Sequence, residues 1–396
     1  MKGNGITRRT LLGNIATVGV AAGTGRAFAD TYGTSPVHRD FADPYLELIR
    51  LLKEGAEIEH DLMIEYLYGA FSLKPAYAEL VGGPQADDSR SLLGITVEEM
   101  QHLGAVNRLL VELDASPVLS RRDFPYDSDI YPFAFELVPL GRVSLAKFTY
   151  CEASPDALPE VSAISNGSRL LLDELKVTLG DGISPNHVGH LYDAIIETLG
   201  EVKNAGLASI DFDAWFEGLD AIKAQGEVGH FEFFQSVYEA EHPLLKEVPG
   251  VWDLPITDER YPCHPVPVNP TAYSGHTNSI EDPELRALAW LGNLNYWCML
   301  SLLDTGYRQN SSLEPTLALT VMMEPLMSVA QQLPAKGAAV PFDPLSMGFE
   351  PGLNAVSEQR FTHLMLEETR DFAQSIEHLL PSDFGLEVYD EVLSAL

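Results

Sequence analysis

The sequence predicts an all-α protein. Apolar residues recur at spacings of three and four through seven long segments, which is the helical period, and few segments resemble strands. Hydrophobic residues make up 45% of the chain and charged residues 21%, the proportions of a folded globular protein. At 396 residues the chain is long enough to form one large domain or two ordinary ones.

Charge and cysteine content exclude several function classes. The chain has 25 Lys and Arg against 58 Asp and Glu, a formal net charge of −33, which argues against a nucleic-acid partner. None of the three cysteines lies in a CxxC or CxxCH spacing, which argues against a disulfide framework, a thiolate metal site and c-type haem attachment. The cysteines are Cys151, Cys263 and Cys298.

The N-terminal segment, residues 1–29, predicts a twin-arginine export signal. Arg8 and Arg9 precede a weakly apolar stretch, and Ala27-Phe28-Ala29 matches an A-x-A cleavage site. A short basic membrane anchor or a frayed tail is the alternative. No other segment reaches about 18 consecutive apolar residues, so we expect no membrane span in the mature chain and a periplasmic or extracellular location.

Four segments in the N-terminal half predict the helices of a bundle. Pro44 lies in the first turn of the first segment, and Thr96 followed by Glu99 resembles a capping box at the start of the second. The stretch 114–165 is rich in proline and irregular, with a strand or two expected around Phe133–Tyr150. The four helical segments are 44–70, 96–113, 186–204 and 213–240.

The C-terminal part predicts further helices beyond a proline-rich connection. Eight prolines between residues 243 and 283 prevent any long element there. Helical patterns follow at 284–305, 314–333 and 357–379. The expected organisation is a signal peptide at 1–29, a bundle at 40–242, a connecting segment at 243–283, and C-terminal helices packed on the bundle at 284–396.

Charged residues occupy the apolar faces of two bundle helices. Glu59 lies on the stripe of the first helix, and Glu99 and His102 lie on the stripe of the second. An ionised carboxylate in an apolar core costs several kcal/mol unless it is paired or coordinates a cation. These three groups therefore indicate a buried metal site.

The Glu-x-x-His motif of Glu99 and His102 recurs in the fourth helix as Glu227 and His230. With 33 Glu and 11 His, chance predicts about one such motif, and the chain has four. The motif alone is therefore weak evidence, and its position on the apolar face of a helix must decide which copies could bind metal. Two motifs on separate helices, with single ligands from the other two, are the pattern of a carboxylate-bridged di-iron bundle.

The third helix lacks an acid on its apolar stripe. His187 and His190 border that stripe, and we expect His190 to supply the ligand that a carboxylate normally provides, with His187 and Glu197 as alternatives. Ordinary histidines at the start of an exposed helix would give the same pattern. The predicted metal ligands are Glu59, Glu99, His102, His190, Glu227 and His230.

Short motifs in all four helices resemble the ferritin-like domain of iminophenyl-pyruvate dimer synthase type. The resemblance implies a ferritin-like four-helix bundle, a bound iron centre, and oxidative coupling of two imines that derive from an aromatic amino acid and are released by a partner oxidase. The motifs are Glu57-Ile58-Glu59-His60, Glu98-Glu99-Met100-Gln101-His102, Gly189-His190-Leu191-Tyr192-Asp193 and Gly229-His230-Phe231.

These expectations combine into an exported ferritin-like protein with one or two iron ions, acting as a non-haem iron oxidase or oxygenase on a small organic substrate. The alternative is a non-catalytic protein of the same class that binds or stores iron, or that serves as a scaffold. The sequence leaves the formation of a homo-oligomer open.

Overall fold

The computed structural model confirms the all-α fold. Its described residues contain helices and two isolated bridges, Leu73 with Cys263 and Thr271 with Ser279, and no strand. The predicted export signal, residues 1–29, lies outside them. The described residues are 37–82, 90–121, 133–154, 187–345 and 355–396, with the single positions 157, 171, 173, 174 and 177.

Two long helices form the centre of the bundle. Helix α2 (Pro44–Ser72) packs along α4 (Leu92–Glu112), and both are buried over most of their length. As predicted, Pro44 lies in the first turn of α2, where Asp43 caps the helix by accepting a hydrogen bond from the backbone N–H of Leu46.

Helix α4 begins four residues before the predicted start. Its N-cap is Ser91, whose hydroxyl accepts a hydrogen bond from the backbone N–H of Gly94. Thr96 lies inside the helix and donates its hydroxyl to the carbonyl of Leu92, so the predicted capping box at Thr96 and Glu99 was wrong.

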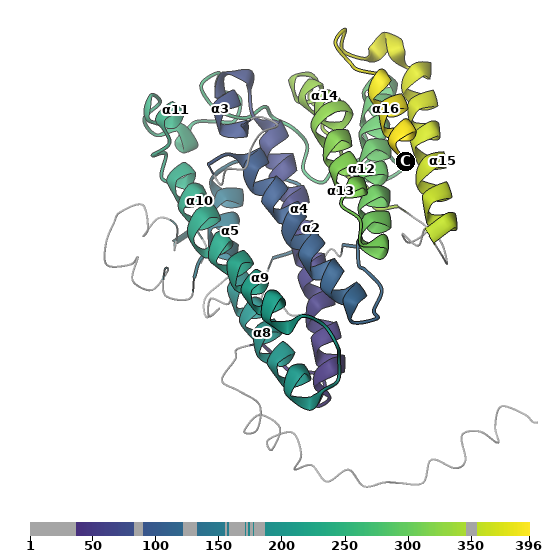
Figure 1. The fold of residues 1–396 in the computed structure, drawn as a ribbon. Helices are drawn as coiled ribbons and strands as arrows, with labels where there is room; N and C mark the ends of the chain where they lie inside the picture. Colours follow the sequence, from purple (N-terminus) through teal and green to yellow (C-terminus); the bar gives the residue numbers. More distant parts are fainter. Residues whose placement is uncertain are drawn as a thin grey trace, which may run out of the picture. The chain divides into compact units, whose positions relative to one another are not determined.

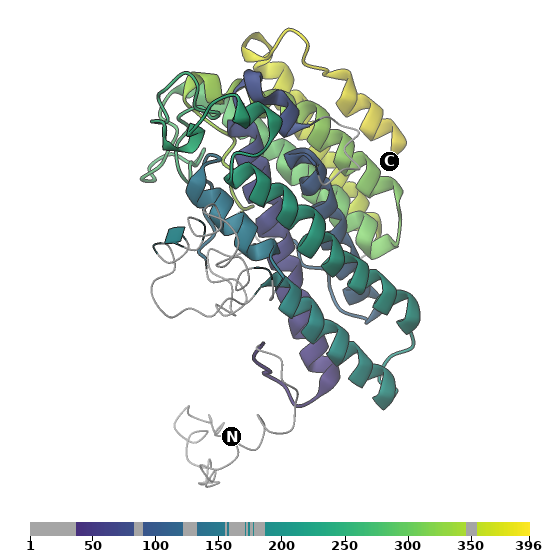
Figure 2. The ribbon, with the colours of Figure 1, turned by 90° about the vertical axis from the view of Figure 1, so that its left-hand side faces the viewer.

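Two shorter helices share the third position of the bundle (Figures 1 and 2). Helix α5 (Arg142–Glu152) packs against α10 (Phe231–Tyr238), and α8 (Val188–Ala205) packs against α9 (Phe212–Ala224) and α2. The fourth position is continuous, because the π-helical segment η2 (Gln225–His230) joins α9 to α10. The third position of the bundle is therefore divided between α5 and α8.

The expected strand around Phe133–Tyr150 was wrong, because residues 142–152 are the helix α5. Ser144 helps to start this helix, since its hydroxyl accepts a hydrogen bond from the backbone N–H of Gly141. A short apolar run does not distinguish a strand from a buried helix by its period alone. This error also concealed the acid at the end of α5, Glu152.

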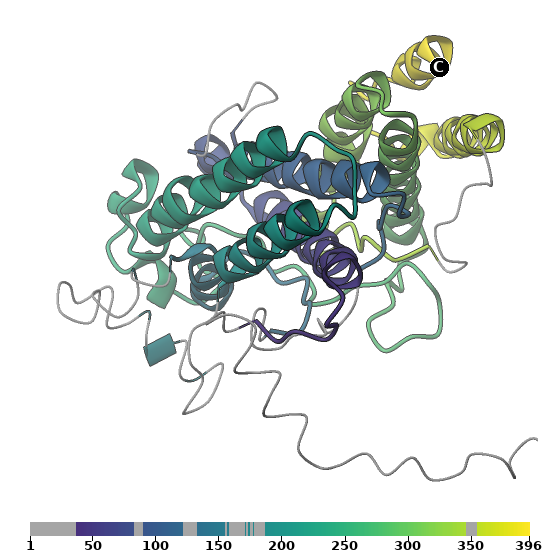
Figure 3. The same cartoon turned by 60° about the horizontal axis from the view of Figure 1, so that its bottom comes forward.

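The C-terminal helices pack beside the centre of the bundle (Figure 3), where α12 contacts α4 and α14 contacts α2. Helix α16 was not predicted. The boundaries of the predicted domains stay predictions. No helix in the described part of the chain has the length and apolar character needed to cross a bilayer. The longer helices are α12 (Pro283–Gln309), α13 (Leu313–Val321), α14 (Met327–Gln332), α15 (Ala355–Ser375) and α16 (Glu387–Ala395).

Short helical turns occupy the connections. The π-helical segment η4 (Met322–Leu326) joins α13 to α14 as η2 joins α9 to α10. The others are η1 (Pro75–Tyr77), α3 (Ala78–Val81), α11 (Pro243–Lys246), η3 (Val251–Asp253), η5 (Pro334–Lys336) and η6 (Glu377–Leu379).

An aromatic cluster locks α5 to α2 and α10. The Tyr66 ring lies 4.7 Å from both Phe148 and Phe234, and those two rings are 5.4 Å apart. We expect Phe234→Ala to lower the free energy of unfolding by about 3–5 kcal/mol, because the fully buried ring leaves a cavity. Urea denaturation measures this. The control is Phe41→Ala, which removes a ring that is 43% exposed. An equal loss of unfolding free energy in this control would contradict the prediction.

Candidate metal centre

Five buried acidic and histidine side chains converge inside the bundle, and each bundle position contributes at least one. Glu59 comes from α2, Glu99 and His102 from α4, Glu152 from the last residue of α5, and His230 from the last residue of η2. Each is at most 6% exposed. Such groups are stable in a core only when a charge or a metal ion compensates them.

The five side chains form two overlapping clusters whose candidate ligand atoms lie within 4.8 Å of one another. Position A consists of Glu59, Glu99 and His102, and position B consists of Glu99, Glu152 and His230. Glu99 belongs to both positions. Each cluster could hold a metal ion, and the carboxylate of Glu99 is common to both.

Distances show how Glu99 serves both positions. Its Oε2 lies 2.9 Å from Nδ1 of His102, and its Oε1 lies 2.9 Å from Nδ1 of His230. The second acid of each position is slightly farther: Glu59 Oε2 is 3.6 Å from Nδ1 of His102, and Glu152 Oε2 is 3.5 Å from Nδ1 of His230. Both histidines thus present Nδ1 to the carboxylates.

Three of the inward-facing atoms, Oε2 of Glu59, Oε1 of Glu99 and Nδ1 of His230, make the ion-pair contacts above but no well-aligned hydrogen bond among the described residues. Buried polar atoms that lack a well-aligned hydrogen bond are rare in folded proteins, and a bound ion is one explanation for them. Carboxylate oxygens and imidazole nitrogens are ligands that suit iron and manganese. The residues present therefore fit a metal pair.

The electrostatics of the metal-free site favour bound protons. Burial and the charge of Glu99 raise the pKa of Glu59 to about 7. Burial lowers the pKa of His102, but Glu99 and hydrogen bonds to Glu59 and Glu99 raise it more, to about 10. Burial also opposes the positive charge on His230, yet Glu99 and Glu152 raise its pKa well above the usual value. Without metal, the protonated form of each histidine is therefore favoured.

Metal affinity should consequently rise with pH. Nδ1 of His102 must lose its proton before it can bind an ion, and a pKa of about 10 lies above the neutral range. With one competing proton, the apparent affinity of position A for Co²⁺ should increase about tenfold per unit between pH 7 and pH 8. Below pH 7 the slope steepens, because Glu59 also holds a proton.

Calorimetric titrations in buffers of different ionisation enthalpy count the protons that metal binding releases. At least one proton per bound ion is expected at pH 7. A proton count near zero, with an affinity that is constant from pH 6 to pH 8, would contradict the prediction.

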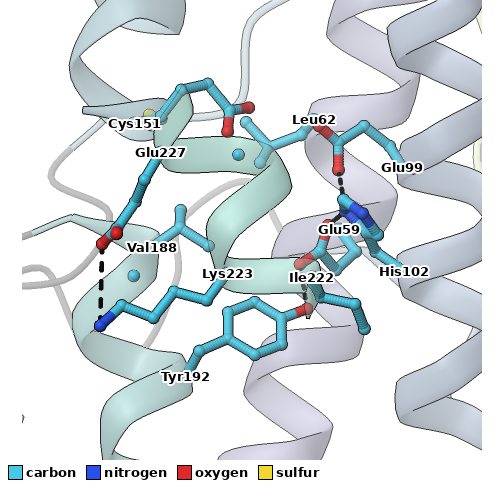
Figure 4. A pocket seen from close by; sticks show the side chains of 13 residues that line it. Glu59, Leu62, Glu99, His102, Cys151, Val188, Tyr192, Ile222, Lys223 and Glu227 are labelled. Carbon is cyan, nitrogen blue, oxygen red and sulfur yellow. Dashed lines mark hydrogen bonds and ion pairs between the residues drawn. The ribbon is translucent and has the colours of Figure 1, made fainter. Parts of the chain in front are cut away.

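Glu227 does not join either cluster. Its carboxylate points toward Lys223, with Oε1 3.9 Å from Nζ, and it lies against Gly189, where an added Cβ would be 2.4 Å from Oε1 (Figure 4). Residues three apart share one face of an α-helix, but η2 is a π-helix, whose wider turn separates them. Glu227 and His230 therefore point in different directions.

The third-helix candidates also lie outside the clusters. His190 is partly buried, and its Nδ1 accepts a hydrogen bond from the backbone N–H of His187. His187 is buried and donates Nδ1–H to the carbonyl of Tyr150, while Glu197 is exposed. The structure places Glu152 of α5 where the sequence analysis expected a third-helix histidine.

Glu152 carries the same signal that identified Glu59. Leu145, Phe148 and Glu152 follow one another at spacings of three and four, and the first two are buried. An acid therefore continues the apolar stripe of α5. A helical assignment of residues 142–152 would have revealed it.

Comparison with known proteins agrees with this geometry. A family model described as Ferritin-like matches residues 52–242, the segment that contains most of α2 and all of α4, α5, α8 and the α9–η2–α10 rod. Residues 52–242 form a ferritin-like domain. No solved structure matches the chain.

A curated protein that is similar to this chain is the dichlorochromopyrrolate synthase of Lentzea aerocolonigenes. The two sequences are 25% identical over 360 residues, which cover 73% of this chain and 34% of the relative. This chain therefore spans about a third of the length of that relative.

A pocket adjoins the centre of the ferritin-like domain (Figure 4). Position A faces it directly, since Glu59, Glu99 and His102 all line it, whereas His230 of position B does not. The wall also includes Tyr192 and Lys223. The other lining residues are Leu62, Cys151, Glu152, Val188, Gly189, Ile222, Gly226 and Glu227.

Proposed function

We propose that the ferritin-like domain binds two iron ions and oxidises a small organic substrate in the adjoining pocket. The observation that carries this proposal is the sharing of Glu99 between two buried clusters, each completed by one further acid and one histidine. A divalent ion at each position would offset the buried negative charge of Glu59, Glu99 and Glu152.

Bound iron would supply the redox chemistry for reaction with oxygen or peroxide. The protein's own residues position and shield that centre. Hydroxyl groups of Tyr192 and Tyr66 donate hydrogen bonds to Oε1 of Glu59 and of Glu152, which leaves Oε2 of each acid directed inward. Buried aliphatic residues such as Leu62 limit the access of water. On one side, position A borders the pocket, from which a substrate would approach the ion.

The substrate class follows from the resemblance and from the named relative. We propose oxidative coupling of imines derived from aromatic amino acids. The test adds an aromatic amino acid and an amino-acid oxidase to the iron-loaded protein, and mass spectrometry detects the coupled dimer. The Glu99→Gln variant is the control that lacks the shared carboxylate.

Dimer formation that requires both iron and Glu99 would support the enzyme. Binding of two ions without consumption of any imine or phenol would favour the non-catalytic alternative, an iron-binding or scaffold protein. Loading of many ions per chain would favour storage, because the two positions described here hold only one pair.

We also propose that residues 1–29 direct export through the twin-arginine pathway. Paired arginines at positions 8 and 9 and the Ala27-Phe28-Ala29 site support this proposal. Fractionation of producing cells should place the shortened chain outside the cytoplasm. Replacement of both Arg8 and Arg9 with lysine should retain the full-length chain inside, and unchanged export of that variant would contradict the proposal.

A further inference from the structure

The two metal positions are built alike on their inner sides. They share Glu99, and each has one further acid, Glu59 or Glu152, held by a tyrosine hydroxyl from Tyr192 or Tyr66. Each histidine presents Nδ1 to the carboxylates. Judged by these ligands alone, the two positions would bind similar ions with similar strength.

The positions differ at the outer nitrogen of each histidine. Nε2 of His102 lies 2.9 Å from Oε1 of Gln225, a neutral amide, whereas Nε2 of His230 lies 2.8 Å from Oε2 of Glu98, a carboxylate. Each partner comes from the opposite helix, because Gln225 begins η2, which ends with His230, and Glu98 belongs to α4 with His102. The outer contacts therefore cross between the two helices.

A carboxylate partner makes an imidazole a stronger ligand than an amide partner does. By accepting the Nε2 proton, it fixes the tautomer with a free Nδ1 and increases the basicity of that nitrogen. Loss of such a partner typically lowers metal affinity by about 10–100-fold. Glu98 should therefore favour the ion at His230.

Enclosure reinforces this difference. His230 is fully buried and does not line the pocket, whereas His102 does. All three side chains of position A line the pocket, whereas position B reaches it only through Glu99 and Glu152. Behind these two acids, His230 lies against Glu98, and Glu152 contacts Tyr66 of the aromatic cluster.

We propose that the two positions are inequivalent and fill in order: position B first, strengthened by Glu98, and then position A, which is weaker and holds the exchangeable ion next to the pocket. Glu98 and Gln225 act as positioning residues that set this order through the histidines. The inference rests on the metal pair of the proposed function.

Titration of the metal-free full chain with Co²⁺ alone, followed by visible absorption and calorimetry, tests the order of filling. The wild type should bind two ions in two resolved steps. His230→Ala should remove the tighter step, and His102→Ala should remove the weaker one. These two variants assign each step to its position.

Glu98→Gln should weaken the first step by about 10–100-fold and leave the second nearly unchanged, because it replaces the carboxylate with an amide of the same shape. Gln225→Glu should have the opposite effect. It should increase the affinity of the second step and so reduce the difference in affinity between the two steps. Glu232→Gln, at an exposed acid of α10, is the matched control for loss of one negative charge and should change neither step.

The outcomes separate this inference from the proposed function. The proposed order of filling would be overturned, and the metal pair kept, by the following result. The protein binds two ions, the affinity of the first step changes less than about twofold in Glu98→Gln, and the affinity of the second step is unchanged in Gln225→Glu. A wild type that binds no Co²⁺ would overturn both. If Glu98→Gln does not fold, as circular dichroism would show, Gln225→Glu decides alone.

Discussion

Glu99→Gln is expected to abolish the binding of both metal ions. Glu99 offers one oxygen to each position, and no other side chain in the described part of the chain belongs to both clusters. Glutamine has no negative charge and only one ligand oxygen, so both positions lose the charge of the shared acid and at least one position loses a ligand atom. Elemental analysis after desalting should fall from two ions per chain in the wild type to below about 0.2, consistent with the loss of a ligand.

The control for this variant is Glu232→Gln, which removes an exposed acid and should keep two ions. Thermal unfolding of the metal-free proteins shows whether Glu99→Gln is folded. Retention of both ions by a folded Glu99→Gln protein would show that the shared carboxylate does not hold the metal pair.

Glu152→Ala and His190→Ala are expected to behave oppositely. Glu152 belongs to position B, whereas the His190 ring lies outside both clusters and contacts the backbone N–H of His187. Glu152→Ala should therefore lose about one ion per chain, because position B keeps only the shared acid and one histidine. His190→Ala should bind two ions with unchanged affinity.

Elemental analysis and Co²⁺ titration of both variants check this pair. Loss of metal in His190→Ala, together with full loading of Glu152→Ala, would restore His190 as the third-helix ligand and contradict the structure's arrangement of position B. Loss of metal in both would indicate that the helices rearrange when the ions bind.

The sequence was sufficient to locate most of the cluster. Glu59, Glu99 and His102 could be selected because each interrupts an apolar stripe whose helical period is long and regular. His230 followed from the repeated motif and its place beside buried aromatic residues. These are the positions where helix phase alone determines which side chains face the core.

The features of the site that the sequence did not predict depend on packing between helices, which the spacing of apolar residues does not encode. Glu152 was missed because the third bundle helix is split, and the short apolar run of α5 is ambiguous between strand and helix. The outward direction of Glu227 depends on the π-helical turn of η2, which the sequence period does not reveal. The outer contacts of Glu98 and Gln225 depend on the register between α4 and η2.

The number of iron ions that the chain binds tests the central claim most directly. Metal-free protein is incubated with excess ferrous iron under anaerobic conditions, desalted, and assayed for iron and protein. The structure, with its two clusters joined by Glu99, predicts two ions per chain. An iron content below about 0.1 per chain in folded protein would contradict a metal centre inside this bundle.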